Sequence, residues 1–317
     1  MMKNTKYLVL SILFMLTMVL SACGGSDESA GNGSGDKENN NSGDNGDKLK
    51  LGQETITIPY VSWPSAIASS NVIKVALEEK GYDVNLKQVN SGAMYTGIAD
   101  KSADSSVCIW LPNTDKEYWK KYKEDIEMLG PNVEGTPLGL VVPKYMEDVN
   151  SIKDLAKNTN SVGDETEFTI TGIEPGSGQM EVTKQQVMKD YGLDKWTLQP
   201  SSSAAMATSL GEAVENEEPI VVTLWSPHWS FSKWDLKYLD DPQNSYGDSD
   251  DINTIARQGL EEDAPRAYEI LDQFSMTKDQ LASVMVKINE GMDPAKAAQE
   301  WTDKNKDVVN KWFKNLK

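Results

Sequence analysis

A motif that occurs twice is the strongest constraint on how this chain folds. Trp110-Leu111-Pro112 runs on to Trp119, and Trp225-Ser226-Pro227 runs on to Trp234, so both copies read W-x-P-x6-W. Each copy follows a short apolar run, which is typical of a buried strand. A tryptophan therefore stands where a strand ends and a loop begins at two separate places, and this repetition predicts two similar lobes.

A shared spacing supports the idea of two equivalent halves. Trp63 stands 47 residues before Trp110 (110 − 63 = 47), and Gly178 stands 47 residues before Trp225 (225 − 178 = 47). Trp63 and Gly178 are therefore expected at equivalent strand-to-helix turns. We expect the indoles of Trp63, Trp110 and Trp225 to face one shared cleft. Facing indoles suit a cation, above all a quaternary ammonium group.

The order of the predicted elements indicates an α/β protein with two lobes. The predicted strands cover 55–61, 84–89, 107–110, 138–143, 168–173, 196–199 and 220–225, and the predicted helices cover 69–80, 94–99, 116–127, 182–191 and 204–215. Two βαβαβ halves of this kind predict parallel sheets, with a ligand beyond the carboxyl ends of the strands.

The same pattern gives the boundaries of the lobes. Residues 54–145 are predicted to form lobe 1 and residues 146–249 to form lobe 2. Residues 250–317 are expected to be mostly helical and to pack on lobe 1. The hinges between the lobes are expected near 140–165 and 235–250.

The N-terminal residues predict export and a lipid anchor. Residues 1–22 have a basic start and an apolar core, as a signal peptide does, and the core is too short for a comfortable membrane span. Leu20-Ser21-Ala22-Cys23 forms a lipobox, which predicts lipid on Cys23. The alternative is ordinary secretion with a coincidental cysteine. Residues 23–53 read as a flexible linker, so we expect an extracytoplasmic protein that is anchored to the cell membrane without spanning it.

Charge and cysteine content exclude several classes of protein. The chain has 31 basic and 49 acidic residues and a net charge of −18, which disfavours binding to nucleic acid. An anionic ligand would need dedicated local donors on such a surface. If Cys23 carries lipid, Cys108 has no partner, so no disulfide framework is expected and Cys108 is predicted to be a small buried apolar residue.

The segment 174–179 contains two glycines at the predicted start of a helix. Glycines there allow backbone N–H groups to approach an anion, although such a segment more often marks a plain turn. Opposite several indoles, the amides of Gly178 and Gln179 would bind a carboxylate while the indoles bind a cationic head. Together these two features match the shape of a betaine.

Four short motifs carry a family resemblance. They are Tyr60-Val61-Ser62-Trp63, Trp110-Leu111-Pro112-Asn113-Thr114, Gly172-Ile173-Glu174-Pro175-Gly176-Ser177-Gly178 and Trp225-Ser226-Pro227-His228-Trp229. Taken together they resemble the glycine betaine-binding lipoproteins of osmoprotectant ABC importers. The resemblance implies a two-lobed periplasmic-binding-protein fold of a type II-like kind, with the ligand in a cleft between the lobes. It also implies a tryptophan cage at Trp63, Trp110 and Trp225, carboxylate donors at Gly178 and Gln179, and an ABC permease and ATPase as partners of a monomer.

Asp115 departs from the family pattern. Members of the betaine-binding group typically have a histidine there, which donates a hydrogen bond to the carboxylate of the ligand. An ionised Asp115 would repel a carboxylate, and it could instead accept a hydrogen bond from the hydroxyl of choline or carnitine. Alternatively, Asp115 caps the helix predicted to begin near Lys116. Glycine betaine, with proline betaine, is the leading ligand, and choline or carnitine is the alternative.

The sequence favours binding over catalysis. No Ser/His/Asp order, Walker loop or metal-ligand cluster stands out, so we expect no enzyme activity, no cofactor and no metal site. His228 is the only histidine and is predicted to be structural. The other tryptophans are predicted to pack in the core or on the surface. A ligand-binding sensor lipoprotein for the same compounds is the alternative to a transport protein.

Overall fold

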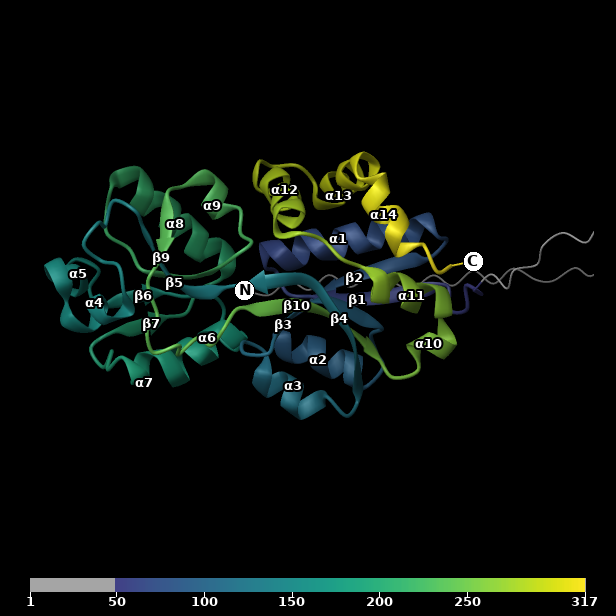
Figure 1. Cartoon of the computed structure of the whole chain (residues 1–317), viewed down its shortest axis with the longest axis horizontal. Coiled ribbons are helices and arrows are strands. Elements are labelled where there is room, and N and C mark those ends of the chain that lie inside the picture. The colour runs from purple at the N-terminus through teal and green to yellow at the C-terminus, as the bar shows by residue number, and fades with distance from the viewer. Residues whose placement is uncertain (1–48, 317) are drawn as a thin grey trace, which may run out of the picture. The chain divides into compact units, whose positions relative to one another are not determined.

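The computed structural model describes residues 49–316, in which strands and helices form two lobes (Figure 1). The predicted signal peptide, Cys23 and most of the predicted linker lie outside the described residues. Within the described part of the chain, no helix combines the length and the apolar character needed to cross a membrane.

Lobe 1 is built on two small sheets. Its strands are β1 (Thr55–Tyr60), β2 (Asp83–Gln88), β3 (Ser105–Leu111), β4 (Ile126–Thr136) and β10 (Asp250–Arg257). β1 and β2 pair in parallel, as predicted, whereas β10 lies antiparallel between β3 and β4. The prediction of an all-parallel sheet is therefore wrong for this lobe.

Helices cover both faces of these sheets. They are α1 (Pro64–Glu79), α2 (Ser91–Ala99), α3 (Lys116–Tyr122), α10 (Leu260–Asp263), α11 (Pro265–Gln273), α12 (Lys278–Asn289), α13 (Pro294–Lys304) and α14 (Lys306–Trp312). Figure 1 shows α1 and α12–α14 on one face of the sheets and α2 and α3 on the other. α1 begins at Pro64, five residues earlier than predicted, because proline suits the first position of a helix.

Lobe 2 is built on one mixed sheet. Its strands are β5 (Leu138–Pro143), β6 (Thr169–Thr171), β7 (Thr197–Gln199), β8 (Val222–Trp225) and β9 (Leu236–Tyr238), in the order β7-β6-β8-β5-β9. β6 is parallel to β7 and β8, as predicted, but β5 is antiparallel to β8 and β9. Its helices are α4 (Ile152–Lys157), α5 (Val162–Glu165), α6 (Gly178–Val182), α7 (Met188–Asp190), α8 (Ser203–Asn216) and α9 (Ser230–Lys233). A short 3-10 turn (Thr159–Ser161) precedes α5, and a π-helical turn (Thr183–Val187) joins α6 to α7.

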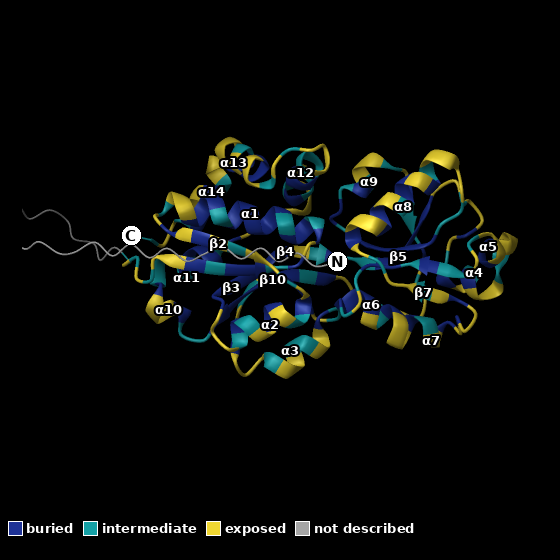
Figure 2. Cartoon of the chain, turned by 180° about the vertical axis from the view of Figure 1, so that it is seen from behind, coloured by how far each residue is buried: buried dark blue, intermediate teal, exposed yellow. Residues whose placement is uncertain are grey.

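Both lobes have a buried apolar interior. Figure 2 shows dark blue, buried residues along the strands and along α1, with exposed residues on the outer faces of the surrounding helices. Leu140, Ile152 and Ile170 belong to a separate core cluster in lobe 2. The other core cluster fills lobe 1 and extends into lobe 2, where it includes Met206, Leu210 and Trp225. The site region is therefore anchored in rigid packing on both sides.

Two chain segments cross between the lobes. Pro137 alone separates β4 from β5, and the second crossing runs from β9 to β10. Asp250 pairs with Thr136, and the Thr136 hydroxyl donates to the Asp250 carbonyl oxygen at 2.6 Å, so the two crossings are joined side by side. The predicted boundary at residue 145 and the predicted hinge at 140–165 are too late, because residues 138–143 pair within lobe 2.

Two strands of lobe 1 were not expected. Residues 250–257 form β10, although residues 250–317 are predicted to be mostly helical. Residues 126–136 form β4, which includes Gly130 and Pro131 and replaces the last part of the helix predicted over 116–127. β10 lies in the middle of its sheet and is buried on both faces, so its sequence lacks the alternation that marks a half-buried strand.

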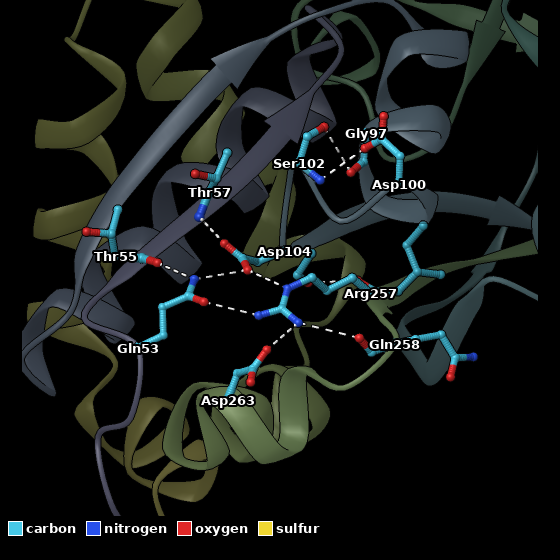
Figure 3. Close-up of polar contacts among 12 residues, drawn as sticks. Gln53, Thr55, Thr57, Gly97, Asp100, Ser102, Asp104, Arg257, Gln258 and Asp263 are labelled. Carbon is cyan, nitrogen blue, oxygen red and sulfur yellow. Dashed lines mark hydrogen bonds and ion pairs between the residues drawn. The ribbon is translucent and has the colours of Figure 1, made fainter.

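The folded body begins earlier than predicted. The Gln53 side chain donates to Asp104 at 3.1 Å and accepts from Arg257 at 3.1 Å, and Arg257 also pairs with Asp104 at 2.8 Å (Figure 3). Arg266 donates to the Leu49 carbonyl oxygen at 2.7 Å. These buried and half-buried polar contacts hold residues 49–53 against lobe 1, so the predicted flexible linker does not extend to residue 53.

Candidate ligand-binding site

Three buried tryptophans from the two lobes line one cavity. Trp63 follows β1 and is the N-cap of α1, Trp110 lies near the end of β3, and Trp225 ends β8. Each is at most 5% exposed. The other residues that line the cavity are Thr114, Leu138, Ile173, Ser177, Gly178 and Gln179. Trp63, Trp110 and Trp225, which the motif and the spacing single out, are called the tryptophan cage below.

The lining of this cavity suits an ammonium group that carries methyl groups. Within residues 49–316, the lining contains indoles, aliphatic side chains and neutral polar groups, and no charged side chain. Indole faces attract a cation, and methylated nitrogen needs no hydrogen-bond acceptor. Trp225 Nε1 is buried without a hydrogen-bond partner among the described residues, so one donor remains free near the cavity.

Backbone donors stand on the lobe 2 side of the cavity. Ser177 is the N-cap of α6, and Gly178 and Gln179 are the first residues of that helix. The N–H groups at a helix start have no acceptor within the helix. The predicted carboxylate donors therefore lie beside the tryptophan cage, while their contact with a ligand stays a prediction.

Gly178 has a second reason to be glycine. A Cβ atom on Gly178 would lie 2.2 Å from the carbonyl oxygen of Thr114, which belongs to lobe 1. Any side chain at this position would therefore push the lobes apart. The sequence suggested only that glycine allows close approach to an anion, whereas the structure adds the close approach of the other lobe.

Gln179 holds the sheet of lobe 2 in place beside the cavity. Its side chain is buried, and Nε2 donates to the Leu224 carbonyl oxygen at 2.9 Å and, more weakly, to that of Gly139 at 3.4 Å. Its Oε1 has no partner among the described residues. Gln179 therefore connects α6 to β8 and β5, directly behind the cage.

Asp115 lies against the backbone of Trp110 and does not line the cavity. Its Oδ2 accepts from the Trp110 backbone N–H at 2.9 Å, and its own N–H donates to the Trp110 carbonyl oxygen at 2.8 Å. Asp115 occupies the N-cap position of α3, but its side chain makes no capping hydrogen bond. Both expected roles of its side chain, ligand contact and helix cap, are therefore absent from this arrangement. The carboxyl fixes the backbone of Trp110 instead.

Burial changes the acidity of Asp115. Burial raises the pKa of Asp115 to about 7, the hydrogen bond from Trp110 opposes that rise, and repulsion from the Asp250 carboxylate adds to it. The nearby Tyr95 hydroxyl also opposes the rise in the pKa, while Oδ1 of Asp115 has no hydrogen-bond partner of ordinary geometry among the described residues. The burial of the Oδ1 side of this carboxyl group is thus only partly compensated.

Asp250 fixes the loop from Trp110 to Asp115, and the sequence did not identify it as a residue of the site. It is fully buried, and its two carboxylate oxygens accept from the N–H groups of Asn113 at 2.6 Å and Thr114 at 2.9 Å. In the sequence it stands in an acidic run, 248–251, that resembles a solvated loop. Two buried carboxylates therefore fix the loop from Trp110 to Asp115, one from within the loop and one from the strand that crosses between the lobes.

Three contacts join the lobes around the cavity. The Trp63 indole N–H donates to the Glu174 carboxylate. The Tyr118 hydroxyl donates to the Gly176 carbonyl oxygen at 2.8 Å, and Thr114 packs against Gly178. Because each contact joins a residue of lobe 1 to a residue of lobe 2, the lobes are closed against each other in this structure.

His228 packs behind the cage. Its ring lies 5.0 Å from that of Trp225 and nearly perpendicular to it, and it is absent from the cavity lining. Burial lowers the pKa of His228 to about 3, so the ring is neutral. This placement fits the structural role predicted for it. Within residues 49–316, no group of His, Cys, Asp and Glu residues is arranged to hold a metal ion.

Comparison with known proteins identifies a family that this chain matches. The model of the substrate-binding domain of ABC-type glycine betaine transport systems matches residues 54–304. The glycine betaine/carnitine transport binding protein of Listeria monocytogenes is 50% identical over 153 residues, which cover 48% of this chain and 51% of that protein. This chain therefore spans about half the length of that curated relative.

Solved structures match over a larger share of the chain. The lactococcal protein in its closed, liganded conformation with glycine betaine is 42% identical to this chain, with a TM-score of 0.78. The match covers 82% of this chain and 100% of the lactococcal chain. A glycine betaine/L-proline-binding protein from Borrelia burgdorferi is 36% identical, with a TM-score of 0.77, over 83% and 99% of the two chains. A choline-binding protein in complex with choline is 26% identical, with a TM-score of 0.75, over 82% and 92%.

Proposed function

Because this chain belongs to the family of substrate-binding domains of ABC-type glycine betaine transport systems, we propose that it captures a quaternary ammonium osmoprotectant for uptake. The observation that carries this proposal is the tryptophan cage, which lines a cavity free of charged side chains between two closed lobes. The cation is held by indole faces. The protein then acts by binding and release, without catalysis.

Glycine betaine, with proline betaine, is the ligand that the site favours. The backbone N–H groups of Gly178 and Gln179 supply donors for a carboxylate on the side of lobe 2. The one feature of the sequence that argued against a carboxylate was Asp115, and its side chain is bonded to the Trp110 backbone and absent from the lining. A carboxylate in the cavity would therefore not face it directly.

Choline or carnitine is the second candidate. The solved choline-binding relative and the Listeria relative named for glycine betaine and carnitine both support this alternative. Choline lacks the carboxylate, so it would leave the amides of Gly178 and Gln179 without a ligand acceptor. That loss predicts weaker binding of choline than of glycine betaine.

Isothermal titration calorimetry of the full chain in detergent tests the proposal. Glycine betaine, proline betaine, carnitine and choline are titrated separately, and glycine betaine is expected to bind most tightly. Proline serves as a control because it has the carboxylate without the methylated nitrogen. If none of the four methylated compounds binds, the proposed function is wrong, and if choline binds most tightly, the order of candidates reverses.

The proposal includes a place in the cell. The lipobox around Cys23 supports a protein outside the cytoplasm that is attached to the cell membrane by lipid. Membership of the family supports an ABC permease and ATPase as its partners, and we propose that it works with them as a monomer. Cell fractionation tests the anchor. Cys23→Ala should move the protein from the membrane fraction to a soluble or unprocessed form, and an unchanged distribution would contradict a lipid anchor at this residue.

A further inference from the structure

A hydrogen bond joins Trp63, which the tryptophan cage takes from lobe 1, to a residue of lobe 2. The indole Nε1–H of Trp63, at the start of α1 in lobe 1, donates to Oε1 of Glu174, in the loop between β6 and α6 of lobe 2. Glu174 is half-buried and is absent from the lining of the cavity. Its carboxylate therefore touches the outer edge of the Trp63 ring, while the ring itself borders the cavity.

The Glu174 carboxylate has no cationic partner in the described part of the chain. The ion pairs formed among residues 49–316 do not include Glu174. The Trp63 indole is the only described group that donates to its side chain. An unpaired negative charge is thus directed at one indole of the cage.

A charged acceptor changes the indole that donates to it. A hydrogen bond to a carboxylate is stronger than one to a neutral acceptor, and it fixes the orientation of the donor. It also polarises the N–H bond, which shifts electron density toward the ring, as hydrogen-bonded groups polarise one another in a site of low dielectric constant. A ring with a more negative face attracts a cation more strongly.

We propose that Glu174 is a positioning residue that acts through the Trp63 indole, orienting it and raising the affinity of the tryptophan cage for a cationic ligand. This inference rests on the proposed function, because it assumes that the cage binds a quaternary ammonium group. Glu174 and Trp63 come from different lobes, so their hydrogen bond forms only when the lobes close. The cage therefore reaches its full strength in the closed state alone.

A double-mutant cycle tests this proposal with the full chain in detergent and glycine betaine as the probe. Glu174→Gln keeps a hydrogen-bond acceptor and removes the charge. It should weaken binding about threefold to tenfold in the wild-type background. Trp63→Phe keeps a ring and removes the N–H donor, so Glu174→Gln should have no further effect in that background.

Two further variants serve as matched controls. Trp110→Phe removes another indole of the same cage but leaves the Trp63–Glu174 contact, so the effect of Glu174→Gln should persist there. Tyr118→Phe removes another hydrogen bond between the lobes, from Tyr118 to the Gly176 carbonyl oxygen, without touching the cage. Its effect on affinity should therefore be the same with Trp63 and with Phe at that position.

The outcomes separate this inference from the proposed function. If Glu174→Gln weakens binding equally in the wild-type and Trp63→Phe backgrounds, the charge does not act through the indole and the inference is overturned. An unchanged affinity of Glu174→Gln in the wild-type background also overturns it. If the wild-type protein itself binds no methylated ammonium compound, the proposed function fails instead.

Discussion

The buried carboxyl of Asp115 should make the stability of this protein depend on pH. Asp115 is 1% exposed, and among residues 49–316 its Oδ2 accepts from the Trp110 backbone N–H while its Oδ1 has no partner. Asp115→Asn keeps the shape of the side chain and an oxygen that can accept from Trp110, and it removes the charge. We expect this variant to be more stable than the wild type above about pH 7, and equally stable near pH 4.

The sign of this pH dependence follows from the higher pKa of Asp115 in the folded protein. Burial raises the pKa of Asp115 from 3.8 to about 7. Below the lower value, Asp115 is protonated in both the folded and the unfolded states, so it has no effect on stability. As the pH rises from 3.8 to about 7, Asp115 loses its proton in the unfolded chain but keeps it in the folded protein, so the free energy of unfolding falls. A difference of about three pKa units corresponds to a loss on the order of 4 kcal/mol, complete above about pH 7.

Urea unfolding at pH 4, 5, 6, 7 and 8 measures this effect, followed by tryptophan fluorescence. The quantity of interest is the difference between variant and wild type, because the other titrating groups, such as the buried His228, contribute to both proteins and cancel. Asp125→Asn, which removes an exposed charge just after α3, controls for the change in net charge. If the difference between Asp115→Asn and wild type does not grow between pH 4 and pH 8, the carboxyl is not held protonated by burial and the reasoning is wrong.

Three further predictions concern the cage, the contact between the lobes and the buried ion pair. Replacing any one residue of the tryptophan cage by alanine should weaken glycine betaine binding roughly tenfold or more by calorimetry, because a desolvated cation–π contact contributes about 2 kcal/mol. Gly178→Ala should weaken binding at least as much while the melting temperature of the ligand-free protein stays near that of the wild type, since its methyl group meets the Thr114 carbonyl oxygen only when the lobes are closed. Arg257→Met should lower the free energy of unfolding by roughly 3–5 kcal/mol, because it leaves Asp104 buried and unpaired, and adding Asp104→Asn should restore part of that loss in urea unfolding.

The tryptophan cage could be predicted from sequence because its signals are local. Trp110 and Trp225 each follow an apolar run that forms a strand, and the strands β3 and β8 end within a residue of them. A strand end in an α/β lobe is where a side chain reaches a ligand. The repeat and the equal spacing then indicated that Trp63 and Gly178 stand at corresponding turns, and both residues border the cavity.

The contacts between the lobes could not be predicted in this way. Glu174 and Trp63 are separated by 111 residues, and Asp250 is separated from Asn113 by 137. Neither acidic residue stands in a pattern that distinguishes it from a solvated one. Their roles arise from the closure of the lobes and from the position of β10. This strand could not be predicted because its sequence contains several polar residues. Asn253 and Thr254 are buried in β10, and the Asn253 side chain donates to the Asp251 carbonyl oxygen at 2.8 Å, so polar residues there are partnered within the sheet.

The division of the site between two lobes links affinity to closure. Trp63, Trp110 and Thr114 come from lobe 1, while Trp225, Gly178 and Gln179 come from lobe 2. A ligand in the open protein would therefore touch only part of the site, and each further contact with the ligand favours the closed state. The observed affinity is the intrinsic affinity of the closed state multiplied by the fraction of the empty protein that is closed. The contact of Tyr118 with Gly176 raises that fraction without touching the ligand, and Glu174 does so from outside the cavity through its hydrogen bond with Trp63. Residues outside the cavity can thus change ligand affinity, as the residues that line it do.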